Sequence, residues 1–277
     1  MFIKNVAIVS PSAVNRIVLK KFLQKYVSVK AFKDFNFNED EFDLIIVDGD
    51  KKCKKCILLK DLGFEGYISD EVRKNIEKLI IGEKKKIKKG KYVLIGSSTG
   101  GPGLIEKIAT SLPEDYPNAV CVAQHMPIGF TKKFASRLNS ISKVEVVEAD
   151  NSTPVIPGYF IIAKSGWHLH FRKKDDVIYT KLVPNTKELF FVPSVDEMFF
   201  SALEVMNPRD ILAVLLTGIG DDGARGLKAL KEAGAYTIAE SEKSAAVYGM
   251  PKAAKEMDAA IEILDFEDIL KRILEFR

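Results

Sequence analysis

Short apolar segments alternate with amphipathic ones along this sequence, and the alternation restricts its fold more than any other feature. In the first part of the chain the expected strands are residues 5–9, 27–32, 44–47 and 66–69. The expected helical segments are residues 13–25, 58–62 and 71–80. The apolar face of the first helix is predicted to hold Val14, Ile17, Val18 and Phe22. This pattern predicts a small parallel α/β unit.

The same alternation continues on a larger scale after residue 91. The predicted strands are residues 92–95, 119–123, 144–148, 159–163, 211–216, 236–239 and 260–264. The predicted helices are residues 103–112, 131–139, 195–206, 224–234, 244–256 and 267–276, the third of them capped by Ser194. Residues 168–171 and 177–183 flank a polar run and predict a β-hairpin. The fold class is therefore α/β, with a doubly wound, mostly parallel sheet whose site lies beyond the carboxyl ends of its strands.

A lysine-rich stretch at residues 83–91 separates the two parts of the chain. It is typical of a solvated linker whose charges repel one another. Its lysines are Lys84, Lys85, Lys86, Lys88, Lys89 and Lys91. The predicted domains are therefore residues 1–82 and 92–277. The basic charge does not indicate nucleic-acid binding, because no aromatic residues interleave with the lysines to stack on bases.

Composition excludes several other classes of protein. Apolar residues make up 47% and charged residues 29% of the 277 residues, as in ordinary globular proteins. No apolar run approaches the roughly 18 residues that span a bilayer, and no secretion signal is evident, so we expect a cytoplasmic protein without membrane insertion. Three cysteines are too few for a disulfide framework. Cys53 and Cys56 are interpreted as two surface cysteines, with a redox pair as the alternative.

The strongest local motif is the turn Gly96-Ser-Ser-Thr-Gly-Gly101, which follows an apolar strand and precedes a helix. It fits the Gly-x-Ser-x-Gly pattern, in which a tight turn exposes a nucleophilic serine, here Ser98. The N-terminus of the following helix offers backbone N–H groups to a developing oxyanion. A turn without chemistry is the alternative. Nucleotide binding is disfavoured, because the P-loop lysine and the Gly-x-Gly-x-x-Gly pattern are both absent.

A serine nucleophile needs a base, which is usually histidine, and this chain has three. His125 follows the strand at 119–123, where an adjacent parallel strand would end beside Ser98. His168 and His170 alternate along a predicted strand and face the same side. No cysteine or acidic residue nearby completes a metal-ligand set with them, so we expect surface or packing roles and predict no metal or cofactor.

A carboxylate at a third strand end is needed to orient the base. The strand at 211–216 runs into a glycine-bracketed turn that holds both Asp221 and Asp222. Aspartate is also a good N-cap, so we expect one of the two to cap the helix that begins near Ala224 and the other to orient His125. Spacing alone does not choose between them.

These turns resemble those of the chemotaxis protein-glutamate methylesterases, the CheB family. The resemblance spans nearly all of residues 92–265 in the family's order. Its motifs are Ile95-Gly-Ser-Ser-Thr-Gly-Gly101, Gln124-His-Met-Pro-Ile-Gly-Phe-Thr131, Pro193-Ser-Val-Asp196, Leu216-Thr-Gly-Ile-Gly-Asp-Asp-Gly-Ala224 and Tyr248-Gly-Met-Pro251. The resemblance implies that Ser98 is the nucleophile, His125 the general base and Asp222 the orienting acid. It also implies that Thr99 and the backbone of Ile219, where the family more often has methionine, help to hold the oxyanion.

The activity implied by the resemblance is hydrolysis of glutamate methyl esters on the cytoplasmic helical region of methyl-accepting chemotaxis receptors, with deamidation of glutamines as a related reaction. We expect Ser98 to attack the ester carbonyl while Nε2 of His125 accepts its proton. One alternative is an esterase of small substrates, which the order of serine, histidine and aspartate disfavours. The other is an inactive scaffold that binds receptors or the chemotaxis histidine kinase.

The family usually carries an N-terminal receiver domain, and residues 1–82 fit that domain poorly. Asp48 matches the phosphoacceptor position of a receiver. However, the first strand ends in Ser10-Pro11 rather than in the acidic residues that hold magnesium, and no lysine is evident near Ser69. We therefore predict a degenerate receiver that is not phosphorylated at Asp48 in the ordinary way.

Overall fold

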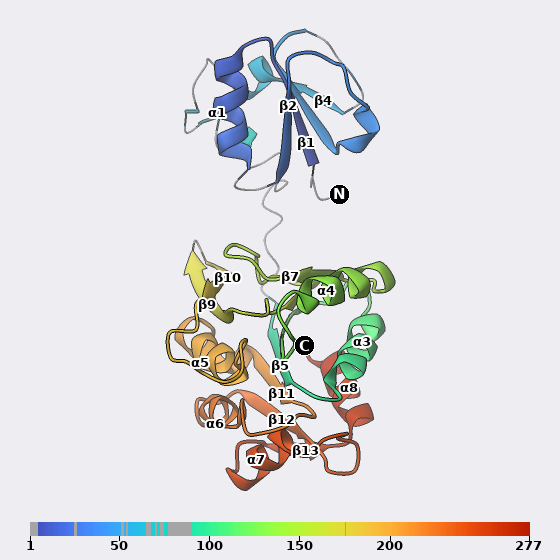
Figure 1. Ribbon diagram of the computed structural model, residues 1–277, viewed down its shortest axis with the longest axis vertical. Helices are drawn as coiled ribbons and strands as arrows, with labels where there is room; N and C mark the ends of the chain where they lie inside the picture. The colour runs from blue at the N-terminus through green and yellow to red at the C-terminus, as the bar shows by residue number, and fades with distance from the viewer. Residues whose placement is uncertain are drawn as a thin grey trace. The chain divides into compact units, whose positions relative to one another are not determined.

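The computed structural model describes residues 5–24, 27–50, 53, 55–64, 68–69, 71–72, 75–76, 90–174 and 176–277. The chain forms two compact units, Met1–Ile87 and Lys88–Arg277, which are described separately (Figure 1). Most of the lysine-rich stretch 83–91 and of the predicted helix 71–80 lies outside the described residues, as does half of the predicted strand 66–69.

The first unit contains a four-stranded sheet with the order β2-β1-β3-β4, in which every pair is parallel. Its elements are β1 Asn5–Val9, α1 Ala13–Leu23, β2 Ser28–Phe32, η1 Glu39–Glu41, β3 Leu44–Val47, β4 Cys56–Leu58 and η2 Leu59–Leu62. Alternate residues of β1 and β3 pack into two core clusters. Burial of both faces explains why these strands are almost continuously apolar. The small α/β unit is as predicted, although the sequence analysis missed the three-residue strand β4.

The apolar face predicted for α1 is wrong for Val14 and Ile17, although Phe22 is buried as predicted. Leu19, Phe22 and Leu23 are the buried residues of this helix, whereas Val14 and Ile17 are 64% and 67% exposed. Leu19 and Leu23 are one helical turn apart, so they form a stripe on the same face. The helix carries apolar residues around most of its circumference, and tertiary packing selects which of them are buried.

The interpretation of Cys53 and Cys56 as two separate surface cysteines is also wrong. The two residues form a disulfide, with Cα atoms 4.9 Å apart. Both are half-buried and pack against a cluster that contains Phe42, Ile45 and Leu58. The disulfide therefore joins the two ends of the short segment that leads into β4.

The second unit contains a seven-stranded sheet with the order β13-β12-β11-β5-β6-β8-β7, in which every pair is parallel. Its strands are β5 Tyr92–Ser97, β6 Ala119–Gln124, β7 Glu145–Glu148, β8 Tyr159–Ile162, β11 Ile211–Leu215, β12 Tyr236–Glu240 and β13 Glu262–Leu264. Its helices are α3 Gly101–Ser111, α4 Phe130–Ile141, α5 Val195–Val205, η3 Pro208–Asp210, α6 Ala224–Glu232, α7 Met250–Glu256 and α8 Phe266–Glu275. β9 His168–Lys174 and β10 Val177–Val183 form the predicted antiparallel hairpin.

Helices cover both faces of this sheet, which confirms the doubly wound α/β class (Figure 1). Val93 and Ile95 of β5 share a core cluster with residues of α3, α4 and α8. Leu94, between them, belongs to a second cluster with residues of α5, α6 and α7. Successive strand residues point to opposite faces, so one apolar run supplies both cores. Among the residues described, none of the helices has the length and apolar character needed to cross a membrane.

The helix predicted at 244–256 begins only at Met250. The residues before it form a loop that bonds to the end of β12 and to the turn after β11. The Ser244 hydroxyl donates to Glu240 over 2.9 Å, and the Val247 N–H donates to the Thr217 hydroxyl over 2.8 Å. These side-chain hydrogen bonds, one local and one tertiary, replace those of a first helical turn, so local helix propensity does not decide the structure here.

The direction of winding reverses between β5 and β11. From β5 the chain proceeds through β6 toward one edge of the sheet, and from β11 it proceeds through β12 and β13 toward the other. Loops that leave neighbouring strands in opposite directions open a crevice at the carboxyl edge of such a sheet. The turns that hold Ser98 and Asp222 follow β5 and β11, on the two sides of this reversal.

The packing at Gly96 leads to a stability prediction. A Cβ at Gly96 would lie 2.3 Å from Cγ1 of Val195 and 2.9 Å from Cδ1 of Leu215, so Gly96→Ala forces α5 away from the sheet. We expect a loss of about 1–3 kcal/mol in the free energy of unfolding. It can be measured by denaturant titration with Trp167, the single tryptophan, as the fluorescent reporter of the second unit.

Gly103→Ala is the matched control, since a Cβ there meets no heavy atom within 4 Å and the residue lies in α3. This variant should be unchanged or more stable by up to about 1 kcal/mol. Equal unfolding free energies for the two variants would contradict the packing argument.

Candidate active site

Ser98 lies in a tight turn between β5 and α3. The turn depends on Gly100, the N-cap of α3, whose φ of 86° favours glycine. The Ser98 N–H donates to the carbonyl of Thr217 over 2.9 Å, and its carbonyl accepts from Gly101 N–H and from Gln124 Nε2 over 2.9 and 2.8 Å. Its hydroxyl makes no hydrogen bond to any residue that the structure describes. The turn is thus fixed through its backbone, and the hydroxyl is left without a partner among the described residues. The expectation of an exposed serine is wrong, since Ser98 is 6% exposed.

Gln124 ties the serine turn to the histidine loop. This residue is 1% exposed; its Oε1 accepts from the Ser97 hydroxyl over 2.6 Å, and its Nε2 donates to the carbonyls of Ser98 and His125. The Gln124 amide therefore fixes the backbone where the chain leaves β5 and where it leaves β6. The sequence analysis quoted Gln124 within a motif but assigned it no role, although a polar residue that ends an apolar strand is a usable signal.

The register of the sheet brings the histidine and the serine together. Ser97 of β5 pairs with Gln124 of β6, and the His125 N–H donates to the Ser97 carbonyl over 3.0 Å. Ser98 and His125 therefore leave adjacent strands, which lie about 4.8 Å apart, at the same level. On the other side of β5, Gly96 pairs with Leu215 of β11, so the loop that contains Asp222 leaves the same edge.

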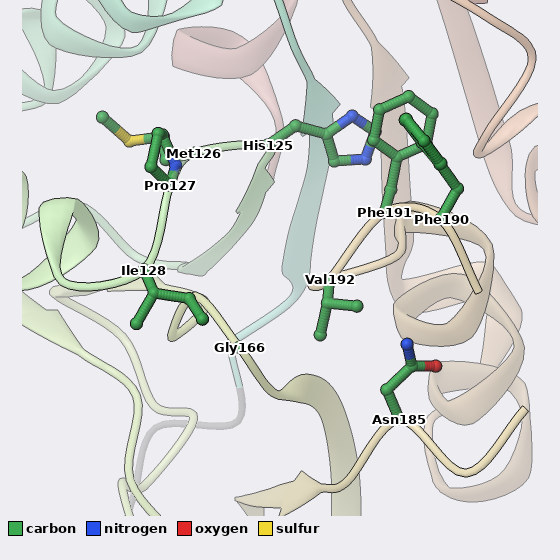
Figure 2. A pocket seen from close by; sticks show the side chains of 9 residues that line it. All are labelled: His125, Met126, Pro127, Ile128, Gly166, Asn185, Phe190, Phe191 and Val192. Carbon is green, nitrogen blue, oxygen red and sulfur yellow. The ribbon is translucent and has the colours of Figure 1, made fainter. Parts of the chain in front are cut away.

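The His125 imidazole is buried between a carboxylate and an aromatic ring. Its Nε2 lies 2.8 Å from Oδ2 of Asp222, and the ring stacks on Phe191 at 4.1 Å between centroids (Figure 2). An ionised carboxylate can only accept, so Nε2 carries the proton in this pair. The expectation that Nε2 accepts the serine proton is therefore wrong. Nδ1, which is buried and has no partner among the described residues, is the nitrogen with a free lone pair.

Asp222 lies at the N-terminus of α5. Its Oδ1 accepts from the Ser194 hydroxyl over 2.8 Å and from Asp196 N–H over 3.1 Å, while its Oδ2 accepts from Val195 N–H over 2.7 Å and from His125. A helix N-terminus stabilises an anion through such unpaired N–H groups. Burial alone would raise the pKa of Asp222, but the hydrogen bonds from His125, Val195 and Asp196 outweigh it and lower the pKa.

The prediction that one aspartate of the pair caps α6 is wrong. The N-cap of α6 is Gly223, with φ of 93° and no side-chain cap, and Asp221 is exposed. The carboxylate at the start of α6 is Asp196 of α5, which accepts from Gly226 N–H over 2.7 Å and from Arg225 Nε over 3.0 Å. Burial raises the pKa of Asp196. Asp222, just before α6, therefore binds the N-terminus of α5, and Asp196 of α5 binds the N-terminus of α6. These contacts give the motif 193–196 its structural role.

Gly218 allows the loop that contains Asp222, here called the acid loop, to lie against Ser98. A Cβ there would lie 2.1 Å from Sδ of Met250 and 2.7 Å from Cβ of Ser98. The Gly218 carbonyl accepts from the N–H groups of Gly249 and Met250 over 3.1 and 2.9 Å. The motif 248–251 thus supports the acid loop from behind.

Thr99 and Ile219 are both exposed at this edge, Ile219 by 57%. The carbonyl of Thr99 accepts from the Thr217 hydroxyl over 2.9 Å. Within the part of the chain that the structure describes, neither the N–H of Thr99 nor that of Ile219 makes a hydrogen bond. Both N–H groups are therefore available to an oxyanion.

A cavity of about 510 Å³ adjoins the His125 imidazole (Figure 2). It is lined by His125, Met126, Pro127, Ile128, Gly166, Asn185, Phe190, Phe191 and Val192. Its rim is strongly apolar, since Ile128 is 81% and Phe190 90% exposed. The sequence analysis missed Phe190 and Phe191, because an aromatic pair in a loop carries no periodic signal.

His168 and His170 both form hydrogen bonds with other side chains or the backbone. His170 Nε2 lies 2.9 Å from a carboxylate oxygen of Glu197, and His168 contacts Ser194 and Asn185. The described residues contain no group of three or more His, Cys, Asp or Glu side chains that could hold a metal ion.

The fold defines a parallel α/β protein. Its site holds a serine, a histidine and an aspartate at the carboxyl edge of the sheet, in the loops that follow the adjacent strands β5, β6 and β11. Residues 93–273 match the family model described as CheB methylesterase, and the chain belongs to this family.

Two curated relatives carry the name protein-glutamate methylesterase/protein-glutamine glutaminase. The one from Carboxydothermus hydrogenoformans is 44% identical over 187 residues, or 67% of this chain and 53% of that protein. The one from Archaeoglobus fulgidus is 44% identical over 184 residues, or 66% and 52%. The crystal structure of the Thermotoga maritima CheB methylesterase catalytic domain is 37% identical, with a TM-score of 0.65, over 68% of this chain and 99% of that one. The matched part of this chain spans about half the length of the curated relatives.

The lowered pKa of Asp222 predicts a dependence of stability on pH. A carboxyl group whose pKa is lower in the folded state stabilises the protein above its unfolded pKa, near 3.8 for aspartate, and this contribution is lost as the pH falls through the folded value. Asp222→Asn should therefore flatten the decline in unfolding free energy below about pH 4. The difference between wild type and variant, followed through Trp167 fluorescence, isolates Asp222 from the opposite contribution of Asp196. Parallel curves for the two proteins would contradict the assignment.

Proposed function

We propose that this protein is a serine hydrolase that removes methyl esters from glutamate side chains of methyl-accepting chemotaxis receptors and deamidates receptor glutamines. The observation that carries the proposal is the buried pair of His125 and Asp222 beside the turn of Ser98, with the second imidazole nitrogen unpaired. The names of the relatives support the reaction and the residues it acts on.

The first half of the proposed reaction forms a tetrahedral intermediate bound to Ser98. The Ser98 hydroxyl oxygen attacks the ester carbonyl while Nδ1 of His125 takes the hydroxyl proton. Nε2–H of His125 remains bonded to Asp222, whose carboxylate stabilises the imidazolium. The N–H groups of Thr99 and Ile219 then bind the oxyanion, at about 3 kcal/mol per donor in comparable enzymes.

The second half returns the enzyme to its starting state. The tetrahedral intermediate collapses as the bond to the leaving group breaks and Nδ1–H of His125 protonates that group, which departs as methanol, or as ammonia when the substrate is a glutamine, and leaves the acyl-enzyme. A water molecule then gives a proton to Nδ1 and attacks the acyl carbon. When this second intermediate collapses, the bond to the Ser98 oxygen breaks, Nδ1–H returns the proton to that oxygen, and free glutamate is released. Every proton in this sequence is carried by His125, so no cofactor is required.

The apolar rim beside His125 agrees with a protein substrate. Ile128 and Phe190 flank the cavity that the imidazole lines, so an apolar surface next to the reacting side chain of a receptor helix would cover them. We place this reaction in the cytoplasm, on the helical region of the receptors. The chemotaxis histidine kinase is a further proposed partner.

We also propose that the first unit is a degenerate receiver domain. Its candidate phosphoacceptor, Asp48, follows β3, and its Oδ2 accepts from the Ser10 hydroxyl over 2.6 Å and from Asn15 Nδ2 over 2.9 Å. A receiver holds magnesium with acidic residues beside this aspartate. Ser10 and Asn15 instead offer hydrogen-bond donors to it, so these residues do not fit the ion.

The hydrogen bonds of Asp48 predict that a small phosphodonor does not phosphorylate it. The expected result after incubation with acetyl phosphate and magnesium is an unchanged intact mass, because Ser10 and Asn15 hold Oδ2 of Asp48 and do not fit the magnesium ion. A receiver domain with its acidic pocket intact is the positive control. A phosphoryl group mapped to Asp48 by peptide mass spectrometry would contradict this proposal.

Ser98→Ala tests the proposed reaction directly. Methanol release from methylated receptor should fall by up to ~10⁶, because the serine and the histidine act as a unit. Ser111→Ala is the matched control, since among the described residues this exposed serine of α3 bonds only to the Lys107 carbonyl of its own helix. Near-normal release by the Ser98 variant would end the proposal.

A further inference from the structure

His168 is a buried histidine that the proposed reaction does not use. It is 3% exposed, begins β9 and has both ring nitrogens in hydrogen bonds. The Ser194 N–H donates to Nδ1 over 3.1 Å, and Nε2 lies 3.1 Å from Oδ1 of Asn185.

These partners fix the protonation state of the ring. A backbone N–H can only donate, so Nδ1 of His168 is unprotonated and accepts from Ser194. The proton is therefore on Nε2, which donates it to Asn185. A protonated imidazole could not accept the Ser194 N–H, and the other tautomer would break both contacts at once.

Each of the two contacts leads to a support of the catalytic imidazole. Ser194 caps α5, and its hydroxyl donates to Oδ1 of Asp222, the carboxylate that binds His125. His168 thus fixes the backbone of the residue that holds the acid.

The second contact leads to the other face of the His125 ring. Oδ1 of Asn185 accepts from the Leu189 N–H, and Nδ2 of Asn185 donates to the Leu189 carbonyl, each over 2.9 Å. This pair of hydrogen bonds is called the Asn185 clamp. This clamp closes the loop just before Phe190 and Phe191, and Phe191 stacks on His125 with an interplanar angle of 4°. Asn185 also lines the cavity beside His125 (Figure 2).

We propose that His168, as the neutral imidazole with its proton on Nε2, is a positioning residue that sets both the acid and the stacking partner of His125. The proposal rests on the assignment of Ser98, His125 and Asp222 in the proposed function. Because His168 contacts neither Ser98 nor His125 directly, it acts through Ser194 and Asn185.

Two isosteric variants separate the two contacts. Asparagine places its amide oxygen near the Nδ1 position and can still accept from Ser194, whereas glutamine places its amide nitrogen near the Nε2 position and can still donate to Asn185. We expect His168→Ala to slow labelling of Ser98 by a fluorophosphonate roughly tenfold or more, as misplaced catalytic groups do. His168→Asn and His168→Gln should each recover part of that loss.

The two recoveries should differ in kind. His168→Gln loses the Ser194 contact. The maximal labelling rate at saturating aryl fluorophosphonate should therefore fall, while the half-saturating concentration of this probe is unchanged. His168→Asn loses the Asn185 clamp beside the apolar cavity, so the half-saturating concentration should rise. His170→Asn, on the same strand but paired with Glu197, is the control and should label within about twofold of wild type. Thermal unfolding of all four variants shows whether they are folded.

The tautomer can be tested in the wild-type protein, independently of any variant. With only three histidines, ¹⁵N-imidazole NMR can be assigned ring by ring, and the signals of His168 are those lost in the asparagine variant. They should be those of a neutral ring protonated on Nε2, and His125, whose Nε2–H bonds to Asp222, should give a separate set. A His168 ring protonated on Nδ1 or on both nitrogens would overturn the proposal, as would wild-type labelling by a folded His168→Ala protein. If labelling follows the expected pattern but methylated receptor releases no methanol, the proposed function fails and the role of His168 stands. If wild-type Ser98 is not labelled at all, the proposed function and the role of His168 both fail.

Discussion

The site depends on one buried carboxylate. Asp222 is 8% exposed and would be costly to ionise there without partners. The start of α5 supplies those partners, because two backbone N–H groups and the Ser194 hydroxyl point at it. The helix dipole adds to their effect. A carboxylate held in this way stays ionised and keeps the proton of His125 on Nε2, which leaves Nδ1 free.

That arrangement follows from the topology of the sheet. Parallel strands place the starts of the following helices at one edge, and the reversal between β5 and β11 sets an acid loop beside a serine turn. The close approach requires residues without side chains at Gly96 and Gly218, where a Cβ would meet Val195 and Met250. These two glycines therefore belong to the architecture of the site as much as the polar residues do.

The parts of the molecule that local chemistry dictates could be predicted from the sequence. The serine turn, the strand that ends before His125 and the cap Ser194 each leave a short-range signal, and the structure contains all three. Spacing could not choose between Asp221 and Asp222, because the choice depends on which one reaches the N-terminus of α5, a helix that lies earlier in the chain. The same holds for the nitrogen of His125 that faces Asp222. It also holds for Phe191, Asn185 and His168, whose roles arise only when distant loops pack together.

The buried face of α1 and the late start of α7 show the same limit in the fold. Val14, Ile17 and Leu19 are all apolar, and periodicity cannot tell which stripe meets the sheet until β1 and β3 are in place. The segment before α7 has helix-forming residues, but Glu240 and Thr217 bind its polar groups first.

The candidate functional aspartates of the two units differ in their hydrogen-bond partners. Asp222 is bound by donors that leave a neighbouring imidazole nitrogen free to act as a base. Asp48 is bound through the same oxygen by the Ser10 hydroxyl and the Asn15 amide, both of which are neutral. Neutral donors satisfy a carboxylate without supplying the positive charge that phosphoryl transfer to it requires.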